Sequence, residues 1–261
     1  RRPANTPTTA ASASASGNDL EEGVGTTPAS APPIAGSARA LYDQGVAAYL
    51  QGDLARASQA FQQAITAEPK AFEAHHALGA TYERMGKTAD ALESYRNAYK
   101  LNPSYGTAIA AYGFLLYRQG SKTEAETFLS DQQAKNPKSL PIMTALAEIK
   151  SLQGDSSAAQ SLAGNALTVD AKYEPAMVLI ARDHFRSGRV DLAGYVLTAI
   201  LDGQKTQEER EKNLPAKTNP PRAPDNAEAH LLRGILLQRQ GERLGAAKWY
   251  ESAVKNRPDL V

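Results

Sequence analysis

Small and large apolar residues recur with a fixed spacing along most of the chain. From residue 38 onward a small residue is followed twelve positions later by a second one, and in five cases a large apolar residue stands four positions further on. Small residues at matching places allow two helices to approach closely, and large residues between them fill the core. The pattern therefore predicts pairs of closely packed helices. The first small residues are Gly45, Gly79, Gly113, Ala147, Ala181 and Gly234, the second are Ala57, Ala91, Ala125, Ala159, Ala193 and Ala246, and the large residues are Phe61, Tyr95, Leu129, Leu197 and Tyr250.

Glycines punctuate this pattern. Gly52, Gly86, Gly120, Gly154 and Gly188 are 34 residues apart, and Gly241 follows after one more period plus 19 residues. Glycine past the end of a helix can adopt the left-handed conformation that closes the helix. Prolines then end the second helix of four units, at Pro69, Pro103, Pro137 and Pro258. A fixed period of this size indicates a repeat array. We therefore predict six helical hairpins, at residues 38–71, 72–105, 106–139, 140–173, 174–207 and 227–260.

Three segments fall outside the pattern. Residues 1–37 are almost all Ala, Ser, Thr, Pro and Gly, so we expect a disordered tail, either a plain linker or a tether to an upstream anchor. The insertion at about 208–226 starts with charged residues that can extend the preceding helix. It continues with four prolines, which predict a projecting loop, either a tolerated surface loop or a binding element. The last hairpin reaches Val261 without a polar terminal element, so we expect further chain or a covering partner there.

This set of positions resembles the tetratricopeptide repeat (TPR), a helix–turn–helix unit of the same period. The first, second and sixth hairpins match it best. The match weakens in the middle, where Ala163 stands at the large position of the fourth hairpin and Ala171 replaces its closing proline. The resemblance implies an all-α fold, a right-handed α-solenoid of about six hairpins. The second hairpin carries most of the family signature, in Leu78, Gly79, Tyr82, Gly86, Ala91, Tyr95, Ala98 and Pro103.

Charge and motif content argue against several functions. The net charge is +1 and no run of four Lys or Arg occurs, which gives no support for nucleic acid or an anionic membrane as the main partner. The chain has no cysteine, and no apolar stretch approaches the roughly 20 residues of a membrane helix. Its four histidines form no metal motif, and no nucleotide-binding or nucleophile motif occurs. We therefore expect no catalytic residues, no cofactor and no metal.

The resemblance also implies where partners bind. In this family the first helix of each hairpin lines a concave groove, and its second, fifth, ninth, twelfth and thirteenth places point inward; we call these the inner-face positions. Tyr42 and Val46 stand where relatives that clamp a C-terminal carboxylate carry Lys and Asn, so no such clamp is expected. The groove mixes aromatic residues with arginines, which are enriched in binding hot spots. The candidate partner-binding residues are Tyr42, Val46, Tyr49, His76, Glu83, Arg84, Phe114, Tyr117, Arg118, Glu148, Arg182, Phe185 and Arg186.

The matching ligand is an extended or helical protein segment with apolar anchors and some acidic residues. Tyr49, Phe114 and Tyr117 are the stronger candidates, because Leu115 and Leu116 already fill a core role beside the last two. Tyr42 and Phe185 could equally pack between hairpins.

The layout of tail and array suggests a cellular role. An Ala/Ser/Thr/Pro-rich tail before a short array is similar to the linker of bacterial outer-membrane TPR lipoproteins, which hold a lipid anchor upstream. Lipoproteins of gliding motility and pilotins of pilus secretins share this layout, and the insertion together with residues 225–230 favours the gliding-motility group. This implies a protein-binding scaffold at the periplasmic face of the outer membrane. A cytoplasmic adaptor or chaperone, and an enzyme subunit, remain alternatives.

Overall fold

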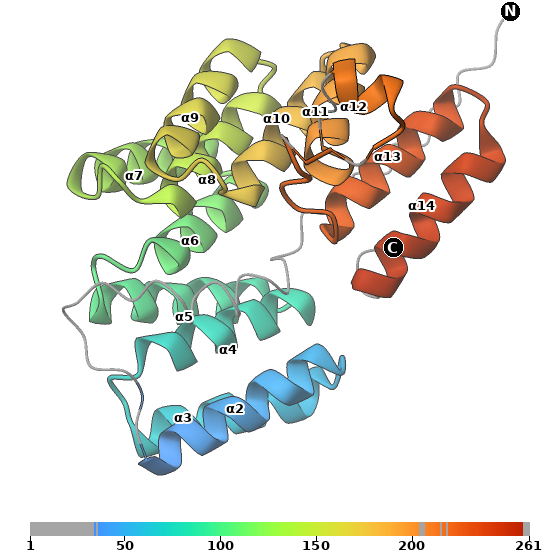
Figure 1. The fold of residues 1–261 in the computed structure, drawn as a ribbon. Helices are drawn as coiled ribbons and strands as arrows, with labels where there is room; N and C mark the ends of the chain where they lie inside the picture. The colour runs from blue at the N-terminus through green and yellow to red at the C-terminus, as the bar shows by residue number, and fades with distance from the viewer. Residues whose placement is uncertain (1–33, 35, 204–206, 215, 218, 258–261) are drawn as a thin grey trace, which may run out of the picture. The chain divides into compact units, whose positions relative to one another are not determined.

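The computed structural model describes residue 34 and residues 36–203, 207–214, 216–217 and 219–257. Throughout these residues the fold is all-α, without a β-strand (Figure 1). The chain divides into two compact units, one ending at Asn102 and one beginning at Pro103. The predicted tail at 1–37 lies outside the described residues, except for the buried Ile34 and for residues 36 and 37, which already belong to the first helix.

The first unit consists of two hairpins. The first pairs α2 (Gly36–Leu50) with α3 (Leu54–Ala67), and the second pairs α4 (Phe72–Arg84) with α5 (Thr88–Leu101). Helix α4 packs on both α3 and α2, so the two hairpins stack (Figure 1).

The second unit holds four hairpins. They are formed by α6 (Gly106–Arg118) with α7 (Lys122–Lys135), α8 (Leu140–Leu152) with α9 (Ser156–Val169), α10 (Glu174–Arg186) with α11 (Val190–Leu201), and α13 (Ala227–Arg239) with α14 (Arg243–Asn256). The first helices pack in succession, α6 on α8, α8 on α10 and α10 on α13. The described residues of the two units therefore form six helical hairpins in chain order.

The turn within each hairpin follows from its glycine. Gly52 has φ +79°, and the following Asp53 donates its backbone N–H to the carbonyl of Ala48 at 2.9 Å. This closure satisfies carbonyls that the end of a helix would otherwise leave unpaired. The same bond recurs at the other five turns, for example from Lys87 to Tyr82 at 2.9 Å.

Close contact between glycines and large residues sets the distance between the paired helices. A Cβ added to Gly45 would lie 2.5 Å from the Phe61 ring, and one added to Gly113 would lie 2.5 Å from Leu129 Cγ. Gly79 and Gly234 face Tyr95 and Tyr250 in the same way. The small and large positions of the sequence pattern are therefore partners across these four hairpins.

The two ends of the predicted insertion loop are anchored to the array. Helix α11 ends at Leu201, and a separate short helix, α12 (Gln207–Glu211), follows instead of an extension. Gly203 has φ +73°, and a Cβ there would lie 2.5 Å from the carbonyl oxygen of Asn219. The backbone N–H groups of Arg222 and Ala223 both donate to the carbonyl of Ile200, at 3.1 and 3.0 Å.

Side chains hold the returning end of the insertion as well. Ala223 is 5% exposed and joins the core cluster of α10, α11 and α13, and the Arg222 guanidinium donates to the carbonyl of Ala171 at 2.9 Å. The prolines therefore shape a segment that is anchored to the fifth hairpin. Pro215 and the predicted helix stop at Pro258 lie outside the described residues.

Candidate partner-binding surface

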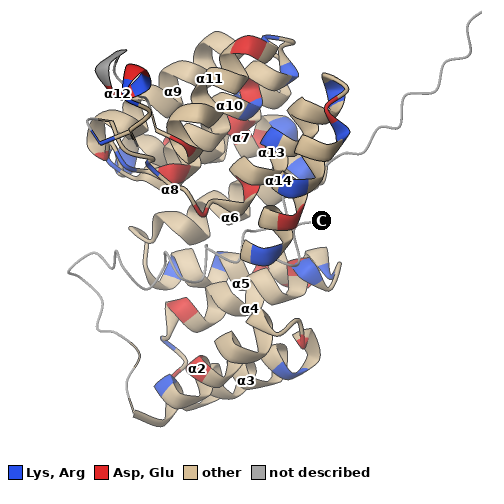
Figure 2. Cartoon of the chain, turned by 45° about the vertical axis from the view of Figure 1, so that its right-hand side comes forward, with Lys and Arg blue, Asp and Glu red and all other residues tan. Residues whose placement is uncertain are grey.

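Four charged residues at inner-face positions join three consecutive first helices of the second unit. Arg182 on α10 donates to Glu148 on α8 at 2.6 Å and to Glu228 on α13 at 2.5 Å. Arg186, one turn further along α10, pairs with the other oxygen of Glu148 at 2.7 Å. We call Glu148, Arg182, Arg186 and Glu228 the ion-pair ladder; its helices can be followed in Figure 2.

Burial makes these ion pairs strong contributors to the arrangement of the helices. The side chain of Glu148 is only 8% exposed and that of Arg182 is 20% exposed. Burial alone would lower the pKa of Arg182, but the nearby Glu228 and Glu148 carboxylates more than offset this and raise it. Because removing one partner would strand a buried charge, Arg182 holds α8, α10 and α13 in one fixed arrangement.

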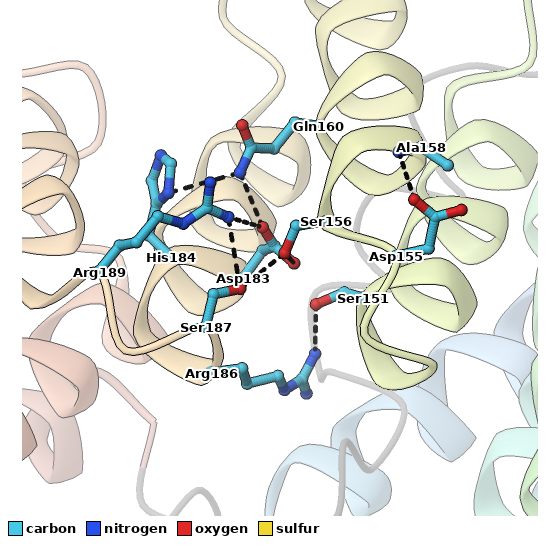
Figure 3. Close-up of polar contacts among 10 residues, drawn as sticks. All are labelled: Ser151, Asp155, Ser156, Ala158, Gln160, Asp183, His184, Arg186, Ser187 and Arg189. Carbon is cyan, nitrogen blue, oxygen red and sulfur yellow. Dashed lines mark hydrogen bonds and ion pairs between the residues drawn. The ribbon is translucent and has the colours of Figure 1, made fainter.

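A second contact recurs between neighbouring hairpins. The arginine at the thirteenth place of one first helix reaches the residue at the twelfth place of the preceding one. Arg84 lies 4.6 Å over the Tyr49 ring, and Arg239 lies 4.3 Å over the Phe185 ring. Arg186 donates to Ser151 Oγ at 3.2 Å in the same relation, as Figure 3 shows. Such cation–π and hydrogen-bond contacts link adjacent hairpins at the ends of their first helices.

The structure places the candidate residues of the first unit mostly inside the protein. Tyr42, Tyr49 and His76 are 4%, 1% and 2% exposed. Tyr42 packs on Phe61, and burial together with Glu73 raises its pKa to about 12. The His76 ring packs against the Tyr95 ring in a tilted arrangement, and burial lowers the pKa of His76 to about 4. The rings of these residues are therefore part of the core.

The other candidates of the first unit are less deeply buried. Glu83 accepts a hydrogen bond from the Tyr95 hydroxyl at 2.9 Å, which ties α4 to α5. Arg84 donates to the backbone carbonyl of Tyr49 at 3.2 Å in addition to covering its ring. Val46 is half-buried.

The preference for Tyr49 and Tyr117 as partner contacts does not agree with their burial. Tyr117 on α6 is 8% exposed, although the adjacent Leu115 and Leu116 are also buried. The neighbouring leucines therefore did not free this tyrosine from a packing role. Phe114 is half-buried and Arg118 is exposed, so these two of the α6 candidates keep accessible surface.

In the second unit the structure brings the candidates Glu148, Arg182 and Arg186 together, and Phe185, on the same helix as the two arginines, contacts Arg239. Their partners Glu228 and Arg239 were missed. Both occupy inner-face positions of the sixth hairpin, the second and thirteenth, so extending the same positions to that hairpin would have found them.

A buried polar cluster lies beside the ladder, between α9, α10 and the turn before α11 (Figure 3). Asp183 is 1% exposed and accepts hydrogen bonds from Ser156 Oγ at 3.0 Å and Gln160 Nε2 at 2.8 Å. Its second oxygen also pairs with Arg189 at 3.0 Å. Ser156, Asp183 and His184 are residue types of a nucleophilic site, but here the serine hydroxyl donates to the aspartate and the carboxylate is already paired. The geometry is that of a structural cluster.

The remaining histidines also have structural contacts. His75 Nε2 lies 3.2 Å from the carbonyl of Pro69, and His230 Nε2 lies 2.7 Å from the carbonyl of Pro224. Both contacts tie a first helix to the loop that precedes it. Among the described residues no group of three or more His, Cys, Asp or Glu could hold a metal ion. No helix in the described part of the chain is long and apolar enough to cross a membrane.

Comparison with solved structures gives a consistent fold. A tetratricopeptide repeat protein from Parabacteroides merdae matches with a TM-score of 0.62 and 18% identity, over 92% of this chain and 85% of that one. PilW, described as a widely conserved type IV pilus biogenesis factor, matches with a TM-score of 0.54 and 17% identity, over 86% of this chain and 96% of that one. Pseudomonas aeruginosa PilF matches with a TM-score of 0.50 and 17% identity, over 85% and 92%. No curated protein matches the sequence significantly.

Family models match the sequence directly. A TPR repeat model matches residues 45–86, and two further tetratricopeptide repeat models match residues 84–149 and 216–260. Together the three matches span more than half of the 261 residues. They cover five of the six hairpins in whole or in part and leave out the fifth, one of the two weakest in the sequence pattern. The chain therefore belongs to the tetratricopeptide repeat family.

Proposed function

We propose that this protein is a non-catalytic scaffold that binds other proteins through the inner-face residues of α8, α10 and α13. The observation that carries the proposal is the partly exposed Phe185 ring with Arg239 stacked on it, beside the ion-pair ladder. Aromatic and arginine side chains dominate binding hot spots, and here both are held in place before a partner arrives. Repeats of this family are generally interaction modules, which supports the same conclusion.

An enzymatic role has less support. The described cluster with the residue types of a catalytic site, around Asp183, has its carboxylate paired with Arg189 and two further donors. A general base must reach the proton that it removes, whereas Asp183 is 1% exposed and three donors already bind its oxygens.

For the cellular role, we propose assembly of a bacterial envelope machine, in first place a surface or gliding motility complex at the periplasmic face of the outer membrane. The polar tail before the array is the feature that suggests an anchored protein. A factor for a pilus secretin is the second candidate. It is favoured by the match to PilW over 96% of that chain, although 17% identity carries the likeness of fold alone. A cytoplasmic adaptor is the remaining alternative.

Cross-linking in the native source, followed by purification of a tagged chain, tests this function. We expect components of an envelope motility or pilus complex to be recovered with the wild type and to be depleted with a Phe185→Ala/Arg239→Ala double variant. A Tyr195→Ala variant is the matched control, because Tyr195 is 63% exposed on the second helix of the same hairpin. Recovery of the same proteins with all three chains would refute the inner-face assignment, and recovery of cytoplasmic proteins alone would refute the envelope role.

A further inference from the structure

Arg239 differs from Arg182 and Arg186, the arginines of the ion-pair ladder, in its interaction partners. Arg182 and Arg186 are both paired with Glu148. Arg239 is exposed, its guanidinium carbon lies 4.3 Å from the centroid of the Phe185 ring, and among the described residues it makes no hydrogen bond or ion pair. Because no described residue binds its N–H donors, these donors remain available to an acceptor.

Charge complementarity indicates which acceptor fits. The ion-pair ladder and Arg239 together contain three arginines and two glutamates, and both glutamates are bound by Arg182. The surface is therefore left with one unneutralised positive charge, fixed over an apolar ring. A single carboxylate with an apolar neighbour matches this arrangement. A polyanion does not, because only one positive charge of this surface is left unneutralised to meet its several negative charges.

We propose that Arg239 on the ring of Phe185 is the binding site for an acidic side chain, Asp or Glu, in a partner segment whose neighbouring apolar residue packs on Phe185. This rests on the proposed scaffold function and names the chemistry that its inner face recognises. The guanidinium forms a charge-assisted hydrogen bond with the carboxylate, and no hydrogen bond to a described residue has to break first. Stacking holds the guanidinium in place, so little side-chain entropy is lost when the carboxylate binds.

Selection from a library of random peptides, displayed with both ends fused so that no terminal carboxylate is free, tests the proposal with the full chain. We expect the wild type to enrich peptides with Asp or Glu next to an apolar residue. A selected peptide is then synthesised with blocked ends, together with its Asp→Asn or Glu→Gln counterpart. The peptides are measured against the wild type, Arg239→Ala, and the control Arg243→Ala, which removes an exposed arginine of the same hairpin.

Neutralising the peptide's carboxyl group should weaken binding to the wild type and to Arg243→Ala by about tenfold or more, the range of a hydrogen bond between charged groups. It should have no effect on Arg239→Ala. A carboxyl effect that persists in Arg239→Ala, or enrichment of apolar peptides without acidic residues, overturns the proposal and leaves the scaffold function standing. Enrichment of no peptide at all would count against the scaffold function itself. Preference for a free C-terminus or for a phosphate group over the blocked acidic peptide also overturns it.

Discussion

Replacing Gly113 by Ala tests the packing that defines each hairpin. The new Cβ would lie 2.5 Å from Leu129 Cγ, 2.6 Å from Cδ2 and 2.9 Å from Cδ1, whereas ordinary contacts begin near 3.4 Å. Leu129 is fully buried, so it cannot turn outward, and α6 and α7 must separate by roughly 1 Å or Leu129 must leave its rotamer. Overpacking of this kind costs about 1–3 kcal/mol.

The helix propensity of alanine opposes that cost and needs its own control. Ala is favoured over Gly inside a helix by about 1 kcal/mol, so the net change at Gly113 is a loss of about 0–2 kcal/mol. Gly164 on α9 lies in the same unit and has no atom within 4 Å of an added Cβ. Gly164→Ala should therefore gain about 1 kcal/mol. The difference between the two variants isolates the packing cost, about 1–3 kcal/mol.

A compensating variant sharpens the test. In the fourth hairpin Ala147 and Ala163 occupy the small and large positions, so Gly113→Ala combined with Leu129→Ala recreates a pair that this chain already tolerates. We expect the double variant to be more stable than the sum of the two single changes predicts, by about 0.5–3 kcal/mol.

Repeat arrays need not unfold in a single step, so the measurement should resolve individual hairpins. Urea unfolding followed by circular dichroism gives the overall change, and hydrogen exchange of the amides in α6, α7 and α9 locates it. Equal stabilisation by Gly113→Ala and Gly164→Ala would show that α6 and α7 are not in contact at this place, and the assignment of small and large partners would be wrong.

Three further changes probe other parts of the molecule. Burial lowers the pKa of His76 to about 4, below its value of about 6.5 in the unfolded chain, so the unfolded chain binds the proton first. The free energy of unfolding should therefore fall by about 3 kcal/mol as the pH drops from 6.5 to 4. Urea midpoints of the wild type and His76→Gln across this pH range test the prediction, and parallel curves would contradict it. Arg182→Met should lower the free energy of unfolding by roughly 1–3 kcal/mol, measured by thermal unfolding, and adding Glu228→Gln should recover part of this stability. If Glu228→Gln lowered the stability further, a stranded charge would be ruled out as the cause. Gly203→Ala should release the insertion, which would be seen as faster hydrogen exchange of the backbone amides within residues 219–226. Gly188→Ala is the control, because Gly188 has the same φ of +73° but open space around an added Cβ, and it should leave this segment protected. Equal effects of the two changes would show that backbone strain alone acts.

The sequence predicted the hairpins well because the relevant contacts are local and repeat. Gly120, which follows α6, and Gly113, which contacts Leu129, lie in one hairpin. The spacing between them follows from helix geometry alone. Once the spacing recurs six times, each hairpin supports the assignment of the others.

The docking of the insertion was not predictable in the same way. Its prolines exclude a helix, but they do not reveal that the backbone at Arg222 and Ala223 will pair with the carbonyl of Ile200. Likewise, the burial of Tyr49 depends on Arg84, which lies in the next hairpin and covers its ring. The docking of the insertion and the burial of Tyr49 both depend on contacts between segments that lie outside a single hairpin. The repeat period does not specify such contacts.

Polar contacts link the two hairpins that depart most from the family pattern, the fourth and the fifth. Ala163 gives the fourth hairpin a small residue where its neighbours have a large one, and this removes apolar surface that would otherwise stabilise the pairing with α8. Asp183 on α10 binds Ser156 and Gln160 of α9, which adds a polar link between the fourth and fifth hairpins.

The ion-pair ladder then fixes α8, α10 and α13 to one another through Arg182. Because α10 and α13 carry Phe185 and Arg239, the relative position of these two side chains depends on the same ion pairs. A change at Arg182 should therefore weaken binding of an acidic segment even though both terminal nitrogens of Arg182 are already bound to Glu228 and Glu148. The two hairpins that depart most from the repeat pattern, the fourth and the fifth, both contribute to the proposed binding surface, so we expect electrostatic packing between hairpins and partner recognition to be coupled.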